Sequence, residues 1–578
     1  MKFQNTKLSI AIVVSTLFIT ASHTTFGDGH AEKVLVNGQI YAGNIKNPWA
    51  TEVAVADGRF VYVGDDASSF VSAETVVYDL EGRTVIPGLI DAHSHPGYVA
   101  LSSELFDLDD TSTKEKLMKS IRKMVAENPD APVLVSGFWP NEFFDVTGPH
   151  KKELDEIESS RPLILYDDWA HTIWANSKAL DQADITRDTE DLVPGFAFYQ
   201  KDENSEPTGW ITESAASAFL NNFQSITPTV EQTLLEYLNY YRELGVTTLL
   251  DAGNFGLDRE MYAAVSRLDK KGLLPVRYHG AYTLFIPSDL PDAVETLKQL
   301  GNDFNSANVQ IDTLKIFFDG VLETRTAAIS KDYLDTPNNR GEALLSRAQV
   351  HELILDLEEE DFNLHVHAVG DRATTTILDA IQDAHESLKR APTITITICH
   401  LEVVKDTDFV RFNELGVIAN FTPHWWTGGG GSWVAQGIGD ESLKMQRAQP
   451  LLSDGAIVTF SSDITDKSEW NSERANPFLG MQVGHTRQDV GMDDDGAFLP
   501  PLSERLQRKD MVNGYTSNAA YQLGRSDEMG SIVVGNRADL LVLNQDLFGV
   551  DKYEIHKTKP DVVMIDGVVV SGELQTRD

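Results

Sequence analysis

Two pairs of histidines, each separated by a single residue, carry the first chemical signal of the sequence. His93 and His95 follow the apolar run 85–90, and His365 and His367 form the second pair. Side chains two positions apart on an extended strand point to the same side, so the imidazoles of a pair can share one metal ion. With 15 histidines in 578 residues, chance alone gives about 0.4 such spacings per chain. The spacing therefore needs independent support.

Position along the chain supplies that support. Five candidate metal ligands fall at or just past the ends of predicted strands: His93, His95, His367, His400 and Asp463. Imidazole nitrogens and carboxylate oxygens suit zinc, manganese or iron, and a catalytic centre leaves one position open for water. We therefore predict a divalent-metal site, with Zn²⁺ as the expected ion. Satisfied core or surface histidines are the alternative.

The elements that must position these residues alternate between buried strands and helical segments, which is typical of a parallel sheet with crossover helices. Eight strands are predicted, at 84–92, 246–250, 275–282, 313–318, 363–366, 395–399, 417–421 and 456–461. This α/β pattern predicts a (β/α)8 TIM barrel. In such a barrel, functional side chains project from the carboxyl ends of the strands.

The chain divides into four predicted parts. Residues 1–27 resemble a signal peptide, because Lys2 and Lys7 precede an apolar run that is too short to span a bilayer comfortably. The β-rich runs in 28–84 and 526–578 indicate antiparallel strands that could form one sheet together. The barrel occupies 85–525. An insertion at about 97–228, after the first strand, is expected to shape the substrate pocket.

Bulk composition excludes some classes of function. The net charge of −40, from 48 basic and 88 acidic residues, opposes nucleic-acid binding because phosphates and carboxylates repel. Cys399 is the single cysteine, so no internal disulfide can form. We expect a periplasmic or secreted protein that makes no membrane contact after signal cleavage and acts on a small molecule. A homodimer is an open alternative.

Several segments together resemble a known family. Residues Pro87 to His95 are similar to the first-strand signature of the amidohydrolase superfamily. Further segments resemble its family 3 branch, which contains N-substituted formamide deformylases and metal-dependent hydrolases named as exoenzyme regulators: 315–320, 367–373, 462–463 and 530–540. The resemblance runs from about residue 33 to the C-terminus. It implies a TIM barrel beside a small β-sandwich built from both termini, and a metal centre.

The resemblance also implies a role for each candidate ligand. His93 and His95 would bind one metal and His367 and His400 the second, while Asp463 would bind the first metal and accept a proton. Lys315 matches a lysine that many relatives carboxylate to bridge two metals. An unmodified ammonium cannot do this because it has no lone pair. The centre would then hold one ion, with Lys315 as a structural or salt-bridged residue.

Two further histidines are assigned by position. The segment from Asp167 to His171, in the insertion, resembles a family segment that usually carries Asp-Gly-His, so His171 is a candidate substrate contact and catalytic electrophile. His365 lies on the same strand face as His367, and we interpret it as a core or supporting residue.

The reaction implied by this resemblance is hydrolysis of an amide-type, non-peptide carbon–nitrogen bond of a small molecule by metal-activated water. The same centre can cleave esters, lactones or dipeptides, and fold and metal do not choose among these bonds. A non-catalytic exported regulator that retained the fold is the more distant alternative.

Overall fold

Eight parallel strands form the central sheet of the computed structural model, which describes residues 30–43, 46–168, 170–427 and 431–577. Their order in the sheet follows the chain: β8 (Leu89–Ser94), β14 (Val246–Asp251), β15 (Arg277–Leu284), β16 (Val309–Phe317), β17 (Asn363–Ala368), β18 (Ile396–His400), β19 (Ile418–Phe421) and β20 (Val458–Phe460). The C-terminal end of β8 and the segment after β20 meet through backbone hydrogen bonds, from Asp463 N–H to the His93 carbonyl (3.0 Å) and from His95 N–H to the Ile464 carbonyl (3.3 Å). The predicted TIM barrel is confirmed.

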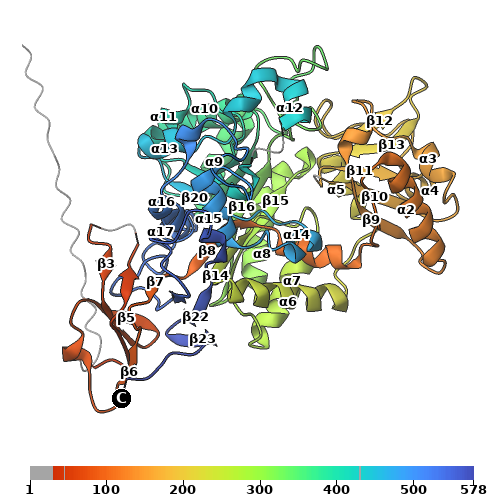
Figure 1. Cartoon of the computed structure of the whole chain (residues 1–578). Helices are drawn as coiled ribbons and strands as arrows, with labels where there is room; N and C mark the ends of the chain where they lie inside the picture. Colours follow the sequence, from red (N-terminus) through yellow and green to blue (C-terminus); the bar gives the residue numbers. More distant parts are fainter. Residues whose placement is uncertain (1–29, 44–45, 169, 428–430, 578) are drawn as a thin grey trace, which may run out of the picture.

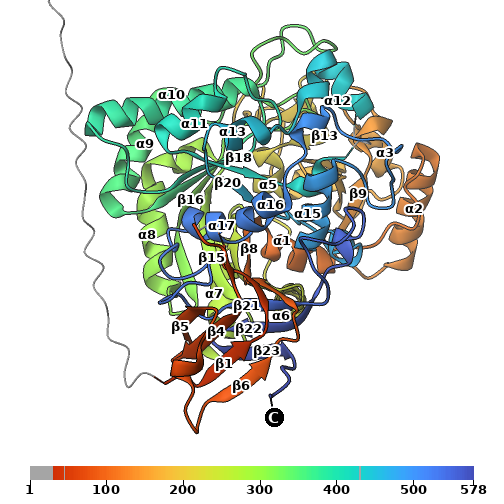
Figure 2. The same cartoon turned by 60° about the vertical axis from the view of Figure 1, so that its left-hand side comes forward.

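Helices cover the outside of the barrel in both views (Figures 1 and 2). They include α6 (Pro228–Glu243), α7 (Asp258–Lys270), α8 (Ala293–Phe304), α9 (Arg347–Glu360) and α10 (Asp371–Leu388). Local sequence fixes where they begin. The Thr227 side chain accepts a hydrogen bond from Val230 N–H ahead of α6, and Ser346 forms a capping box with Gln349 ahead of α9.

The predicted first strand, Thr84 to Ala92, is wrong as a single element. β7 (Thr84–Pro87) pairs with β21 (Leu540–Leu543) in a terminal sheet, whereas β8 begins the barrel at Leu89. Gly88 separates them. Its N–H donates to the Asp539 carbonyl at 3.1 Å, and a Cβ there would lie 2.6 Å from the Thr247 side chain. The chain crosses between sheets at a residue where no side chain fits.

The two ends of the chain build a separate pair of sheets. One contains β1 (Lys33–Val36), β4 (Glu52–Ala56), β5 (Arg59–Gly64) and β6 (Val76–Asp79). The other contains β2 (Gln39–Tyr41), β3 (Trp49–Ala50), β7, β21, β22 (Pro560–Ile565) and β23 (Val568–Gly572). Leu35, Val85 and Leu540 share one core, which confirms the small sandwich. The antiparallel prediction is only partly right, because β1 pairs with β6 and β2 with β7 in parallel. In both cases a long connection returns the chain to the same end of the sheet.

The insertion after β8 forms a five-stranded sheet of its own, in the order β12-β13-β11-β10-β9. Its strands are β9 (Leu134–Trp139), β10 (Leu163–Asp167), β11 (Thr172–Ala175), β12 (Tyr199–Lys201) and β13 (Pro207–Thr212). Trp139, Leu165 and Trp174 belong to a separate core. Figure 1 shows the insertion, in orange, away from the terminal sheets, in red and blue. The predicted signal peptide lies outside the described residues, and none of the helices within them is long and apolar enough to cross a bilayer.

Candidate metal centre

Four histidines and one aspartate meet at the carboxyl ends of the barrel strands. The Nε2 atoms of His93 and His95, at the end of β8, lie 3.3 Å apart. Asp463 Oδ1, in the loop after β20, lies 3.5 Å from both. Asp463 Oδ2 lies 3.4 Å from His400 Nδ1, and the His400 and His367 rings are 4.4 Å apart between centroids. The structure thus brings together the four predicted histidine ligands and the predicted carboxylate ligand, Asp463.

The hydrogen bonds of the imidazoles fix which nitrogen faces the centre. His95 Nδ1 lies 3.1 Å from the Gly253 carbonyl, and His367 Nε2 lies 3.3 Å from the Gly320 carbonyl. A carbonyl oxygen only accepts, so these nitrogens carry the proton and the other nitrogen of each neutral ring keeps a lone pair. His93 Nδ1 is bonded in turn to His365 Nε2 at 3.0 Å. Such outer contacts orient metal-ligating histidines.

Burial favours the neutral form of the clustered histidines, which is the form that binds a metal cation. Burial, followed by the nearby Lys315 ammonium, lowers the pKa of His95 to about 3. Burial is also the largest cause that lowers the pKa of His93, His367 and His400 well below the ordinary histidine value. Burial raises the pKa of Asp463 to about 7, although Lys315 opposes the rise. Neutral imidazoles and one carboxylate are the donor set that a divalent metal such as zinc takes.

Backbone strain coincides with two of these residues. His400, Leu401 and Asp463 have φ angles of 74°, 51° and 50°. A non-glycine residue in this left-handed region costs roughly 1–3 kcal/mol, and such residues cluster where function requires a particular side-chain direction. The strain therefore marks the strand ends that carry His400 and Asp463.

Lys315 extends from β16 into the same cluster and is 1% exposed. Its Nζ donates to Cys399 Sγ at 3.2 Å, and the thiol donates to the Val366 carbonyl at 3.3 Å. Burial raises the pKa of Cys399 to about 12. Cys399 Sγ also lies within 4.8 Å of a ring nitrogen of His93 and of His400. Lys315 therefore lies beside the candidate ligands. Its ammonium has no lone pair for a metal, whereas a carboxylated amine would present oxygen atoms that can bind one.

His171 reaches the centre from the insertion. Its ring stacks on Phe317, with centroids 5.5 Å apart and planes at 29°, and lies 6.0 Å from the His367 ring. Its Nδ1 is 2.7 Å from Glu213 Oε2. Burial alone would lower the pKa of His171, but the Glu213 carboxylate more than offsets it and raises the pKa to about 9. A protonated imidazole can donate a hydrogen bond to an oxygen atom bound at the rim.

Comparison with known proteins agrees with this geometry. Residues 76–571 match the model of the amidohydrolase family. The chain belongs to this family. It is 31% identical to the exoenzymes regulatory protein AepA of Pectobacterium carotovorum subsp. carotovorum over 430 residues, which are 72% of this chain and 90% of that protein. It is 26% identical to the N-substituted formamide deformylase of Arthrobacter pascens over 555 residues, 93% of this chain and 97% of that one.

The fold of this amidohydrolase is also found in solved structures. An uncharacterized metal-dependent hydrolase from Pyrococcus horikoshii ot3 has a TM-score of 0.66 at 23% identity, over 90% of this chain and 99% of that one. This likeness shows the shared fold. The family match and the two relatives confirm the resemblance seen in the sequence, and family membership together with the donor set supports a metal-dependent hydrolase.

Two residues of the amidohydrolase centre, Glu213 and Cys399, escaped the sequence analysis as site residues. Glu213, the partner of His171, lies 42 positions away and belongs to no recognised motif. Cys399 gave information only on disulfides. Trp425, which is not one of these two, also lies at the centre, where its ring stacks on His400 with centroids 5.7 Å apart and planes at 14°. Cys399 directly precedes His400, a predicted ligand, so its position in the sequence was a signal that could have identified it.

Proposed function

We propose that this amidohydrolase hydrolyses a non-peptide, amide-type carbon–nitrogen bond of a small molecule at a zinc centre. One observation carries the proposal: Asp463 lies within 3.5 Å of nitrogens of three buried, neutral histidines, on the rim that His171 approaches. The relative named N-substituted formamide deformylase, which aligns with 93% of this chain, favours the amide class.

Each ligand has a place in the proposed centre. His93 and His95 would hold one ion together with Asp463. His367 and His400 would hold the second, with carboxylated Lys315 between the two. The chemistry that a divalent ion supplies when bound is activation of a water molecule and polarisation of the scissile carbonyl.

The protein's own residues then move protons and stabilise charge. Asp463 accepts the proton of the attacking water and returns it to the leaving nitrogen, the two-way role of a general acid/base. Glu213 orients His171 and keeps it protonated. His171 donates a hydrogen bond to the carbonyl oxygen, where negative charge develops in the transition state.

A substrate panel tests this proposal. The purified full chain is assayed with an N-substituted formamide, an aryl ester, a γ-lactone and a dipeptide, before and after chelation and with zinc restored. We expect formamide turnover that disappears on chelation and returns with zinc. Turnover confined to the ester, lactone or dipeptide would overturn the choice of bond. Full metal content without turnover of any compound would favour a regulatory protein.

We further propose that the mature chain is periplasmic or secreted, after cleavage of residues 1–27, and that its partner is a small molecule rather than nucleic acid. The apolar run behind Lys2 and Lys7, and the net charge of −40, support this. N-terminal sequencing of chain recovered from outside the cytoplasm checks it. An intact Met1 on cytoplasmic protein would contradict it.

A further inference from the structure

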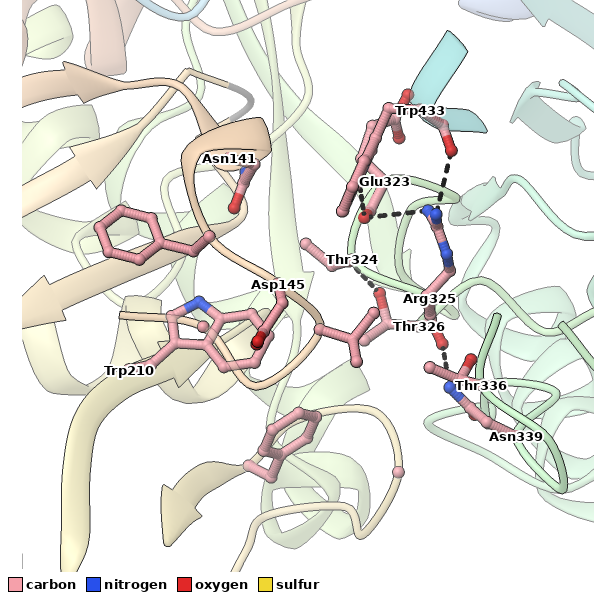
Figure 3. Close-up of a pocket in the computed structure, with 15 residues that line it drawn as sticks. Asn141, Asp145, Trp210, Glu323, Thr324, Arg325, Thr326, Thr336, Asn339 and Trp433 are labelled. Carbon is pink, nitrogen blue, oxygen red and sulfur yellow. Dashed lines mark hydrogen bonds between the residues drawn. The ribbon is translucent and has the colours of Figure 1, made fainter. Parts of the chain in front are cut away.

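A pocket of about 320 Å³ lies between the insertion and the loop that follows β16 (Figure 3). The insertion contributes Phe144, Phe198 and Trp210, and α12 (Gly431–Ile438) contributes Trp433 from the facing side. Phe198 and Trp210 meet edge to face, with ring centroids 6.1 Å apart and planes at 90°. Aromatic side chains therefore line the pocket from both sides.

Two chains of hydrogen bonds join the walls of this pocket to the surroundings of His171. Thr324, which lines the pocket, donates to Glu213 Oε1 at 3.0 Å, and Glu213 Oε2 lies 2.7 Å from His171 Nδ1. On the insertion side, the backbone N–H of Asn141 donates at 3.3 Å to Asp168, which stands three residues before His171 in the sequence. The pocket therefore lies beside the residue that we place against the scissile carbonyl.

The two charged residues on the barrel side of the pocket, Arg325 and Glu323, offer a ligand no free charge. The Arg325 guanidinium directs its donors to the Asp335 carboxylate and to three backbone carbonyls. Burial raises the pKa of Glu323, which favours its neutral form. Asp145, on the insertion side, is exposed and accepts from Thr147 N–H at 2.8 Å. Burying an ion without a free partner is costly, so the pocket suits an uncharged group.

The volume of the pocket corresponds to two fused rings rather than to one. A cavity of about 150 Å³ holds one benzene molecule, and this pocket, at about 320 Å³, has roughly twice that space. Aromatic side chains attract flat rings in offset or edge-to-face arrangements. A single ring would leave about half of the pocket unfilled, whereas a two-ring group can contact the walls on both sides.

We propose that this pocket binds the substituent on the amide nitrogen of the substrate, and that this substituent is an uncharged group of two fused aromatic rings. The inference rests on the proposed hydrolase function and names its substrate class. Because the acyl part of a formamide is a single carbon, the nitrogen substituent is the part that can fill the pocket. Phe198, Trp210 and Trp433 then determine specificity, while His171 contacts the carbonyl oxygen.

Three formamides, with methyl, benzyl or 2-naphthylmethyl on nitrogen, test the inference on the zinc-loaded full chain. We expect kcat/KM for the naphthylmethyl compound to exceed that of the benzyl compound about 5- to 30-fold, and that of the methyl compound at least about 100-fold. Val146 lines the pocket and is 42% exposed, so Val146→Trp fills the pocket without disturbing a core. Val146→Trp and Phe198→Ala should each reduce the naphthylmethyl-to-methyl ratio at least about fivefold. Val568→Trp, on the exposed edge of β23, is the matched control and should keep the ratio.

Direct binding separates this inference from the proposed reaction. Calorimetry compares 2-naphthylmethanol with benzyl alcohol on the same proteins, whose folding is checked by thermal unfolding. If no formamide is hydrolysed but 2-naphthylmethanol binds more tightly, and Val146→Trp removes the difference, the two-ring pocket holds and the proposed reaction falls. Equal kcat/KM and equal Kd across the compounds, or a preference for benzyl over naphthylmethyl, would overturn the two-ring pocket even with all three formamides hydrolysed. A naphthylmethyl preference that survives both pocket substitutions would overturn it as well.

Discussion

Replacing Glu213 by glutamine removes one negative charge beside His171 and keeps the shape of the side chain. In the wild type, the Glu213 carboxylate holds His171 Nδ1 at 2.7 Å and accepts from Thr324 at 3.0 Å and from Thr326. Hydrogen bonds to charged groups contribute about 1.5–3 kcal/mol and neutral ones about 0.5–1.5. The loss is therefore about 1–2 kcal/mol, which corresponds to about a 5- to 30-fold lower kcat/KM. Because His171 acts on charge that develops in the transition state, most of this loss in kcat/KM should appear as a lower kcat.

Steady-state kinetics on an N-substituted formamide, paired with metal analysis, measure this effect. Metal content should stay at the wild-type level, because Glu213 is not among the proposed ligands. His171→Asn and the double variant should be equally slow, since Glu213 acts through His171. Glu203→Gln, exposed on the insertion, is the control. Unchanged kcat/KM in Glu213→Gln, or losses that add in the double variant, would refute this role.

Three further substitutions test other parts of the molecule. Lys315→Ala should reduce the metal content from two ions to one per chain, because it removes the carboxylated bridge; metal analysis in bicarbonate buffer that finds no change would contradict this. His365→Phe should weaken zinc affinity about 10- to 100-fold by freeing the His93 ring, as measured by competition with a chelator, and equal affinity would exclude His365 from the centre. Arg277→Met leaves Asp539 without its buried cation, bonded at 2.6 Å, and should cost about 3–5 kcal/mol of unfolding free energy. An unchanged urea midpoint would be the contrary result.

The barrel could be predicted because its strands are short, buried apolar runs that alternate with helices. The same rule placed His93, His367, His400 and Asp463, since the carboxyl ends of parallel strands meet at one rim. The boundary at Gly88 could not be predicted. The apolar run continues through it, and the reason for the break is the Thr247 side chain and the Asp539 carbonyl, both distant in sequence.

Residues supplied by contacts between distant segments were the ones that sequence reasoning missed. Glu213 matters because the insertion folds over the rim, and no local pattern reports that fold. An isolated glutamate in a chain with 88 acidic residues carries no signal. Pairing in the terminal sheets was equally hidden, because alternation of apolar residues gives a strand but not its direction.

The most direct test of the metal centre is the metal content of the purified mature chain and of its His93→Ala variant, with turnover measured on the same samples. We predict bound zinc and chelator-sensitive hydrolysis in the wild type. In His93→Ala we predict loss of metal and loss of turnover together, because the 3.3 Å pair with His95 is broken. Full metal content and undiminished turnover in His93→Ala would contradict the assignment of the centre.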